Sequence, residues 1–178
     1  MIRPLPGMLL YPALIAFLIT LALWSPAPAA DSLPQVSLST ENLGPRSIED
    51  LTRKTIARDY ALAWQTMAQA LEQNRIDVLE GYFTGSAKDN LIRRVASQKQ
   101  TGIRVRYGDL GHKLEAVFYS PAGDAMQLRD RANLQIQTFD GSKVIHSEQV
   151  TLQYMVLMTP GADRWLVRDL ETTPEAHP

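Results

Sequence analysis

The sequence predicts an α+β domain in which three N-terminal helices pack in a curved antiparallel sheet of about four strands. Apolar residues recur at helical spacing from Ser47 to Gln100, and from Ile103 they alternate with polar residues. The turn pairs Asp140-Gly141 and Pro160-Gly161 separate the alternating segments. Strands joined by such short turns run antiparallel, so the apolar side of the helices must cover one face of the sheet.

The first helix is predicted from Ile48 to about Gln73. The preceding pattern Ser47-Ile48-Glu49-Asp50 is typical of a capping box, and Asn74 is a residue type that ends helices in the left-handed conformation. One apolar stripe follows the helical period through Leu51, Ile56, Tyr60, Trp64, Met67 and Leu71. This long helix should therefore lie along the core.

Two shorter helices are expected next. The first contains Ile76, Leu79, Tyr82 and Phe83 at helical spacing, and Asp77 lies where a carboxylate meets the positive end of a helix. Gly85 interrupts the pattern, and Ser86-Ala87-Lys88-Asp89 repeats the capping box. The third helix then runs to about Gln100, where Gly102 ends it, with apolar positions at Ala87, Leu91, Ile92, Val95 and Ala96.

The rest of the domain is predicted to form strands with one buried face. Two rows are expected to point inward, namely Met126, Leu128, Asp130, Ala132, Leu134 and Ile136, and then Val150, Leu152, Tyr154, Val156 and Met158. Ile103, Val105 and Tyr107 and, near the C-terminus, Trp165, Val167 and Asp169 also alternate with their neighbours, and Leu114, Ala116 and Phe118 indicate a further extended stretch. The polar residues that alternate with the Met126–Ile136 row form an outer row, which is a candidate surface for a homodimer through the sheet. They are Gln127, Arg129, Arg131, Asn133, Gln135 and Gln137.

The N-terminal segment predicts that the folded domain is located outside the cytoplasm. Arg3 precedes an uncharged apolar run from Met8 to Trp24, and Ala27-Pro28-Ala29 has the A-x-A form of a signal-peptide cleavage site. A cleaved signal peptide over residues 1–29 is favoured, and an uncleaved membrane anchor is the alternative, because the run is barely long enough to span a bilayer. The domain is then exported, periplasmic or extracellular, or membrane-anchored with its folded part outside the cytoplasm.

The remaining boundaries follow from composition. Residues 30–46 have scattered Pro, Ser, Asn and Gly and are predicted to be a flexible linker, with docking of Leu33, Val36 and Leu38 as an edge strand as the alternative. The folded domain covers residues 47–172, and residues 173–178 form a polar tail.

Charge and residue usage exclude several classes of function. The formal net charge is −1, which argues against a general nucleic-acid binder. The chain has no cysteine, so disulfides and cysteine-based zinc sites are excluded. Its three histidines, His112, His146 and His177, are far apart in the sequence and do not have the spacing of metal ligands. No metal and no cofactor are therefore expected.

The order of elements resembles the nuclear transport factor 2-like superfamily, also called SnoaL-like, over Ser47 to Glu171. The most similar stretch is QNRIDVLEGYF, Gln73 to Phe83, where many members place a turn, an Asp and an apolar helix that ends in an aromatic residue. The resemblance implies a cystatin-like cone, with the sheet wrapped around the long helix and often a pocket inside. It implies no single function, because this cone hosts enzymes, transport adaptors and non-catalytic assembly modules.

The resemblance also implies where a site would lie. Isomerase members use a Tyr on the first helix, an Asp base after the short helices and an acid on a strand, and Tyr60 and Asp130 match the first and the last. The base is missing, since Thr84-Gly85-Ser86 leads directly into the third helix; helix capping explains Asp77 better. The candidate pocket residues are Tyr60, Trp64, Tyr82, Phe83, Asp130, Tyr154 and Trp165, and the alternative is that their rings simply fill the cone.

A basic patch completes the candidate features. It comprises Lys88, Arg93, Arg94, Lys99, Arg104 and Arg106. These residues form either a solvated face or a contact surface for anionic lipid or an acidic partner. Together these observations favour an exported non-catalytic domain that binds a protein partner or a small apolar ligand. An isomerase or dehydratase acting on a small hydrophobic molecule is the alternative, and a structural module of an envelope assembly is the third hypothesis.

Overall fold

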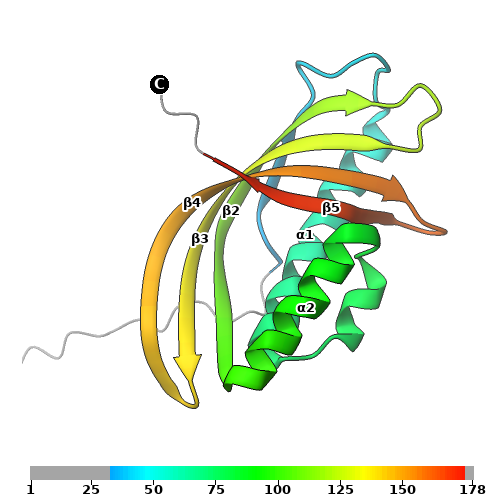
Figure 1. Cartoon of the computed structure of the whole chain (residues 1–178). Helices are drawn as coiled ribbons and strands as arrows, with labels where there is room; N and C mark the ends of the chain where they lie inside the picture. The colour runs from blue at the N-terminus through cyan, green and yellow to red at the C-terminus, as the bar shows by residue number, and fades with distance from the viewer. Residues whose placement is uncertain (1–32, 175–178) are drawn as a thin grey trace, which may run out of the picture.

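The computed structural model describes residues 33–174, in which helices lie in the hollow of a curved sheet (Figure 1). The predicted signal peptide or anchor, residues 1–29, lies outside the described residues. The elements in order are β1 (Val36–Ser39), α1 (Asp50–Gln73), the 3-10 helix η1 (Asp77–Gly81), α2 (Gly85–Thr101), β2 (Ile103–Tyr119), β3 (Met126–Asp140), β4 (Lys143–Pro160) and β5 (Trp165–Thr173). Within residues 33–174, no helix has the length and apolar character needed to cross a membrane.

Helix α1 begins later than predicted and ends where predicted. Its first residue is Asp50, and no side chain caps its N-terminus, because the Glu49 carboxylate instead binds Arg46 and Thr52. At the other end Asn74 takes the left-handed conformation, with φ 53° and ψ 44°. The apolar stripe is buried from Ile56 onward, whereas Leu51 is 77% exposed.

The middle helix of the three predicted is a single 3-10 turn, so the domain has two α-helices. After Gly81 the chain leaves the helix because it pairs with β5: the Thr84 amide donates to the Val167 carbonyl, and the Val167 amide donates to the Tyr82 carbonyl. Helix α2 follows with Thr84 as its N-cap. The predicted cap Ser86 instead donates its hydroxyl to the Arg168 carbonyl, 3.0 Å away, and Gly102 ends α2 in the left-handed conformation as expected.

The sheet has five strands in the order β1-β2-β3-β4-β5. Strands β2 to β5 are antiparallel neighbours, as predicted. The additional strand, β1, runs parallel to β2 and pairs Val36 with His112 and Ser39 with Glu115. It lies within the predicted linker, at the position for which an edge strand was the alternative.

Two register shifts in β2 decide which of its side chains face the core. The shift between Asp109 and Gly111 changes the inward positions from odd to even numbers, and the shift between Ala116 and Phe118 changes them back. Such bulges turn the following side chains to the other face of the sheet. The extended stretch predicted at Leu114, Ala116 and Phe118 is part of β2, but the second bulge leaves Phe118 38% exposed and buries Tyr119.

Strand β5 shows the same effect. Its register with β4 shifts at Arg168, since Val167 pairs with Met158 and Asp169 pairs with Leu157. Leu170, not the predicted Asp169, then packs against the core. The alternation predicted for β3 is confirmed, because its inward positions from Met126 to Leu134 are fully buried.

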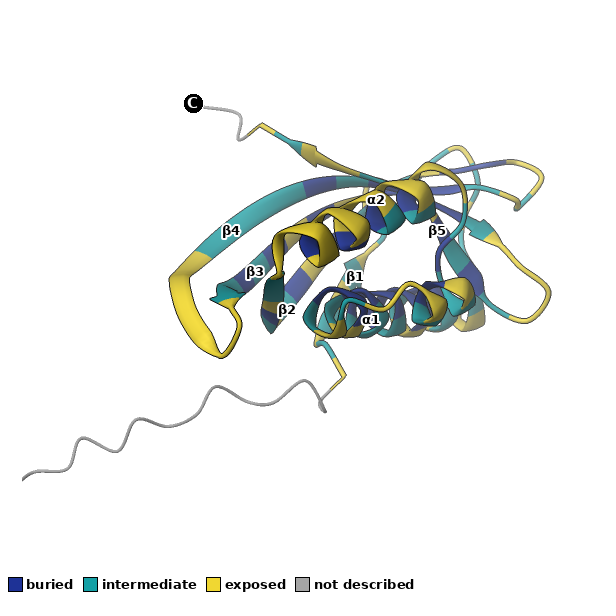
Figure 2. Cartoon of the chain, turned by 60° about the horizontal axis from the view of Figure 1, so that its bottom comes forward, coloured by how far each residue is buried: buried dark blue, intermediate teal, exposed yellow. Residues whose placement is uncertain are grey.

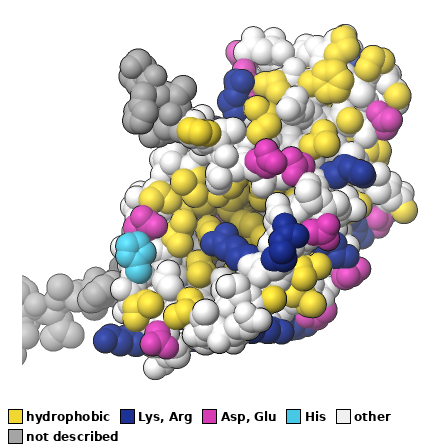
Figure 3. Space-filling view, in the orientation of Figure 1, with side chains coloured by type: hydrophobic (Ala, Val, Ile, Leu, Met, Phe, Trp, Pro, Cys, Tyr) yellow, Lys and Arg dark blue, Asp and Glu magenta, His cyan; other side chains and the backbone are white. Residues whose placement is uncertain are grey.

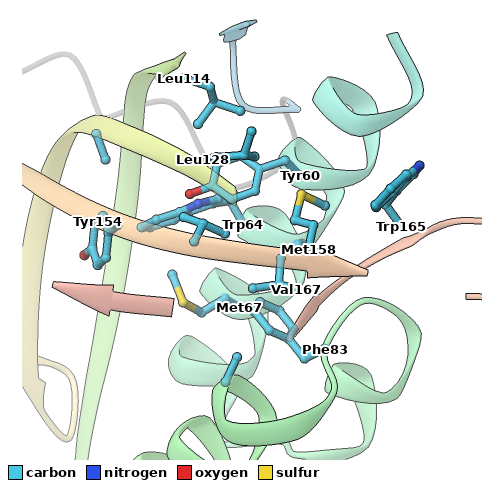
Figure 4. Close-up of a cluster of buried hydrophobic side chains, with 14 of the residues drawn as sticks. Tyr60, Trp64, Met67, Phe83, Leu114, Leu128, Tyr154, Met158, Trp165 and Val167 are labelled. Carbon is cyan, nitrogen blue, oxygen red and sulfur yellow. The ribbon is translucent and has the colours of Figure 1, made fainter. Parts of the chain in front are cut away.

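The core lies between the two α-helices and the part of the sheet that they cover (Figures 2 and 4). The far half of the β3–β4 hairpin extends beyond the helices (Figure 2), and residues 143–149 of β4 are all exposed. The molecule is therefore a cone that is filled at one end and open at the other, where α2 faces the curved sheet.

Candidate functional site: a sealed polar cluster and an apolar cavity

A chain of four polar side chains crosses the core. Asp130, on β3, is completely buried, and its Oδ2 accepts a hydrogen bond from the Tyr60 hydroxyl of α1 at 2.7 Å. The same oxygen lies 2.7 Å from Nδ1 of His112 on β2. The other ring nitrogen of His112 lies 2.6 Å from Oδ2 of Asp109. Because both ring nitrogens face carboxylate oxygens, both donate, and the ring is an imidazolium.

The charges of this polar cluster, Tyr60, Asp109, His112 and Asp130, stabilise one another. Burial lowers the pKa of His112, but hydrogen bonds and attraction from Asp109 and Asp130 outweigh burial and raise the pKa from 6.5 to about 9. Burial and then the Asp130 carboxylate hold the pKa of Tyr60 well above its ordinary value of 10. At neutral pH the cluster therefore contains a neutral phenol and a charged imidazolium held by two carboxylate groups.

Aromatic rings pack over the buried members of the polar cluster, while the side chain of its outer member, Asp109, is 17% exposed. The Trp64 ring lies 4.4 Å from the His112 ring, centroid to centroid, and the Tyr60 ring lies edge-on to His112 at 5.7 Å. Within the described residues, Oδ1 of Asp130 and Nε1 of Trp64 are buried without a hydrogen-bond partner.

A cavity of about 170 Å³ opens next to this sealed region, between α2 and the sheet. It is lined by Met67, Ala87, Asn90, Leu91, Arg94, Tyr107, Tyr154, Leu170 and Thr172. Figure 3 shows an apolar hollow on this face of the molecule, with Lys or Arg side chains at its edge. We call it the mouth cavity, because it lies at the open end of the cone.

Trp64 separates the mouth cavity from the polar cluster. Its ring packs against Tyr154 at 5.4 Å and against Tyr107 at 6.4 Å, while it also contacts His112. Tyr60 and Asp130 do not line the mouth cavity. A ligand in this cavity would touch the two tyrosines and would be held away from Asp130 by the indole ring.

The rim of the mouth cavity is polar. Arg94 donates from Nη2 to the Tyr107 hydroxyl at 2.7 Å, and its guanidinium carbon lies 5.5 Å from the centre of that ring. Burial raises the pKa of Tyr154, the neighbouring Tyr107 adds to this effect and Arg94 opposes it. The phenol of Tyr154 therefore stays protonated and can donate a hydrogen bond.

The structure brings together four of the seven predicted pocket residues. Tyr60, Trp64, Asp130 and Tyr154 form one region, but only Tyr154 lines the mouth cavity. The other three lie elsewhere: Phe83 bridges to Val167, Trp165 packs against Tyr119 at 6.3 Å, and Tyr82 lies under the Arg164 guanidinium. Figure 4 shows Trp165 and Tyr154 at opposite ends of the buried cluster.

Sequence reasoning missed His112, Asp109 and Tyr107 as members of the site. His112 was set aside as a scattered histidine, yet it shares the even-numbered register of Leu114 and Ala116. The spacing of two residues between His112 and Leu114 was the sequence signal that could have placed His112 in the core. Gly111, with φ 127°, sits at the bulge that brings His112 into this register.

The predicted basic patch divides into groups with local partners. Lys88 pairs with Glu80 at 2.8 Å, and Arg106 pairs with Glu72 at 2.7 Å. Arg104 and Arg106 lie over the Phe139 ring, Arg93 binds Asn90, and Lys99 is exposed in the last turn of α2. Arg94 differs from the rest because it faces the mouth cavity.

A metal site of at least three His, Cys, Asp or Glu side chains is not found within residues 33–174. The polar cluster contains three such side chains, but its imidazolium carries protons on both nitrogens and holds the carboxylates apart. Fold and site together define a cone-shaped α+β domain with a buried polar cluster and a cavity of polar and apolar residues at its mouth.

Comparisons with known proteins bear on the fold. No protein-family model and no curated protein matches the sequence. Solved structures with a similar fold include the intermembrane space region of the chloroplast protein ARC6, with a TM-score of 0.60 and 14% identity over 71% of this chain and 98% of that one. Another is a candidate dehydratase of the NTF2-like family from Streptomyces avermitilis, with a TM-score of 0.48 and 11% identity over 70% of this chain and 99% of that one.

At these identities the similarity concerns the fold alone. The predicted α+β architecture, with an antiparallel sheet that curves around the long helix, is confirmed. The function has to be argued from the site itself.

Proposed function

We propose that this domain is a non-catalytic binding module whose mouth cavity takes a small apolar ligand of about one ring. The observation that carries the proposal is the volume and lining of the cavity, about 170 Å³ over a floor of Met67, Leu91 and Leu170. An engineered apolar cavity of about 150 Å³ in another protein binds benzene. Pockets for drug-sized molecules usually measure about 300–1,000 Å³, so a single ring or a short chain fits best.

The sealed polar cluster favours binding over catalysis. An isomerase or dehydratase must bring its substrate within hydrogen-bond reach of an acid or a base. Asp130 lies beside Tyr60, as the enzyme hypothesis requires, but both are fully buried. Neither lines the mouth cavity, and the Trp64 ring lies between.

The binding function is tested with toluene as the probe. We expect toluene to raise the melting temperature of the purified protein and to shift the NMR signals of residues around Leu91. Ala87 is buried and lines the cavity, so Ala87→Leu should fill the space and abolish both effects. The matched control is Ala96→Leu, the same change at an exposed position of the same helix. Absence of toluene binding, or equal binding by Ala87→Leu, would overturn the proposal.

A protein partner is the second candidate, and the β3–β4 hairpin supports it. Strand β5 pairs only with residues 153–160 of β4, so residues 143–152 have no strand on that side within the described part of the chain. Val144 and Ile145 there are 43% and 52% exposed. An unpaired strand with exposed apolar side chains is a site where partner strands add.

Co-purification from the native envelope tests the partner hypothesis. The wild type should retain a partner that Ile145→Lys loses and Ala87→Leu keeps. If the protein retains no partner and no probe binds the mouth cavity, the structural role in an envelope assembly is favoured instead.

We further propose that the domain acts outside the cytoplasm, on the basis of the signal-like pattern in residues 1–29. N-terminal sequencing of the protein from its native membrane and soluble fractions tests this. A mature chain that begins near Ala30 supports cleavage, and an intact Met1 in the membrane fraction supports the anchor.

Self-association through the outer face of the sheet is also a proposal. Arg129 and Arg131 are exposed on that face. Analytical ultracentrifugation should show a dimer that Arg131→Glu weakens, and a monomer at all concentrations would overturn it.

A further inference from the structure

We infer that the ligand of the mouth cavity is a small apolar carboxylate, whose charged end is held at the rim by Arg94, Tyr107 and Tyr154. This inference rests on the proposed binding function and adds the charge and the orientation of the ligand. It follows from the polar groups that border the cavity, from their charge and from the hydrogen-bond donors that they leave free.

Arg94 supplies the positive charge. It is the only charged residue among the nine that line the cavity. Within the described residues its side chain forms no ion pair, whereas Arg106, Arg129 and Arg164 all pair with carboxylates. A guanidinium has five N–H donors, and the hydrogen bond to the Tyr107 hydroxyl is the one the structure shows.

The two tyrosines supply further donors. The Tyr107 oxygen accepts a hydrogen bond from Arg94, which leaves its own O–H free to donate. Within residues 33–174, the Tyr154 hydroxyl forms no side-chain hydrogen bond, and its raised pKa keeps its proton in place. A guanidinium with two phenol O–H groups matches the acceptor oxygens of a carboxylate, and such charge-assisted hydrogen bonds are about twice as strong as neutral ones.

The apolar residues at the floor of the cavity determine the shape and polarity of the uncharged part of the ligand. Met67, Leu91 and Leu170 offer no hydrogen bond, so an unbranched chain or a ring fits beneath the polar rim. None of the nine lining residues is acidic, and the Asp130 carboxylate, which also acts on Tyr154, does not line the cavity and is paired with the His112 imidazolium. Benzoate has the size and the charge that this arrangement selects.

A comparison of benzoate, benzamide and toluene by NMR titration at low salt tests the inference. We expect benzoate to bind at least about tenfold more tightly than its neutral isostere benzamide, which is a typical effect of one good charged contact. Arg94→Gln should remove most of this preference and should change the affinity for toluene much less than the affinity for benzoate. Tyr107→Phe should reduce the benzoate affinity several-fold by removing one donor.

Lys99→Gln is the matched control, because it removes one positive charge from the same helix at an exposed position outside the cavity. If Lys99→Gln weakens benzoate as much as Arg94→Gln does, the preference is a general attraction of anions and the inference is overturned. If toluene binds while benzoate binds no better than benzamide, the inference fails and the proposed binding function stands. If neither toluene nor benzoate binds, the proposed function fails, and the inference fails with it.

Discussion

Asp130 and His112 form a buried ion pair, with Oδ2 of the carboxylate 2.7 Å from Nδ1 of the imidazolium. Neither side chain has any exposed surface. The Tyr60 hydroxyl donates to the same carboxylate oxygen, so α1 is tied to β2 and β3 through a single atom. Removing one member of a buried pair leaves an uncompensated charge, which is more costly than the pair itself is stabilising.

The stability of the domain should fall as pH rises through the titration of His112. Its pKa is raised from 6.5 to about 9 in the folded state, so its contribution is complete below pH 6.5 and is lost as pH rises through 9. The free energy of unfolding should decrease between these limits by on the order of 3 kcal/mol. Urea titrations from pH 6 to pH 9.5 measure this change.

His112→Gln is the control for the pH dependence. The variant lacks the titrating ring, so its stability should be lower at pH 6 and should change less with pH. A second measurement is the NMR titration of the His112 ring in the wild type, which should remain protonated at pH 7.5. A ring that is neutral at that pH would contradict the buried ion pair.

Tyr60→Phe should destabilise the domain by about 1–3 kcal/mol, because the buried Asp130 carboxylate loses a hydrogen bond that no water can replace in the sealed core. Tyr82→Phe is the control, since Tyr82 lies half-buried on the other side of the molecule and its contact with Arg164 involves the ring. Chemical denaturation of both variants at pH 7 measures the difference. Equal effects would show that the Tyr60 hydroxyl is not an essential partner of Asp130.

Asn74→Ala should cost more stability than Asn74→Gly, by about 1 kcal/mol. Both variants lose the hydrogen bonds of the Asn74 side chain with Ile103 and Gln98. Only alanine adds strain, because position 74 has φ 53° and the left-handed conformation disfavours a residue with Cβ. Thermal unfolding of the pair isolates this backbone term, and an alanine variant as stable as the glycine variant would contradict it.

Gly85→Ala should destabilise the domain more than Gly102→Ala. Both glycines have positive φ, 55° and 71°, so both variants are strained by about 1–2 kcal/mol. A Cβ at position 85 would also lie 3.0 Å from the Arg168 carbonyl oxygen, whereas a Cβ at position 102 meets open space. Urea unfolding of the two variants compares them directly. Equal losses would mean that the contact between α2 and β5 can relax without cost.

Much of the fold was predictable because its signals are local. The helical period of α1, its end at Asn74 and the alternation of β3 depend only on residues that are neighbours in the chain. The resemblance of the element order also predicts Tyr60 and Asp130 as a pair, and the two side chains are in contact. The second predicted helix is a short 3-10 helix instead, because hydrogen bonds to β5, more than 80 residues away, redirect the chain after Gly81.

The site was less predictable because it depends on register. A bulge between Asp109 and Gly111 turns His112 into the core, and a bulge of one residue leaves no clear trace in a pattern of period two. Arg94 belongs to the basic face of α2 by sequence, and only its contact with Tyr107 assigns it to the mouth cavity. Contacts between residues on different elements are not encoded by the spacing of either element alone.

The sequence by itself determined the α+β class, the long first helix, the inward row of β3 and the turns between the antiparallel strands, because periodicity and turn chemistry act over a few residues. The tertiary structure decided that Trp64 packs between His112 and Tyr154, that His112 carries its charge inside the core, and that Arg94 and two tyrosines border the mouth cavity. These features arise where strand register and helix packing bring distant side chains together, and burial then sets their charge and hydrogen bonding.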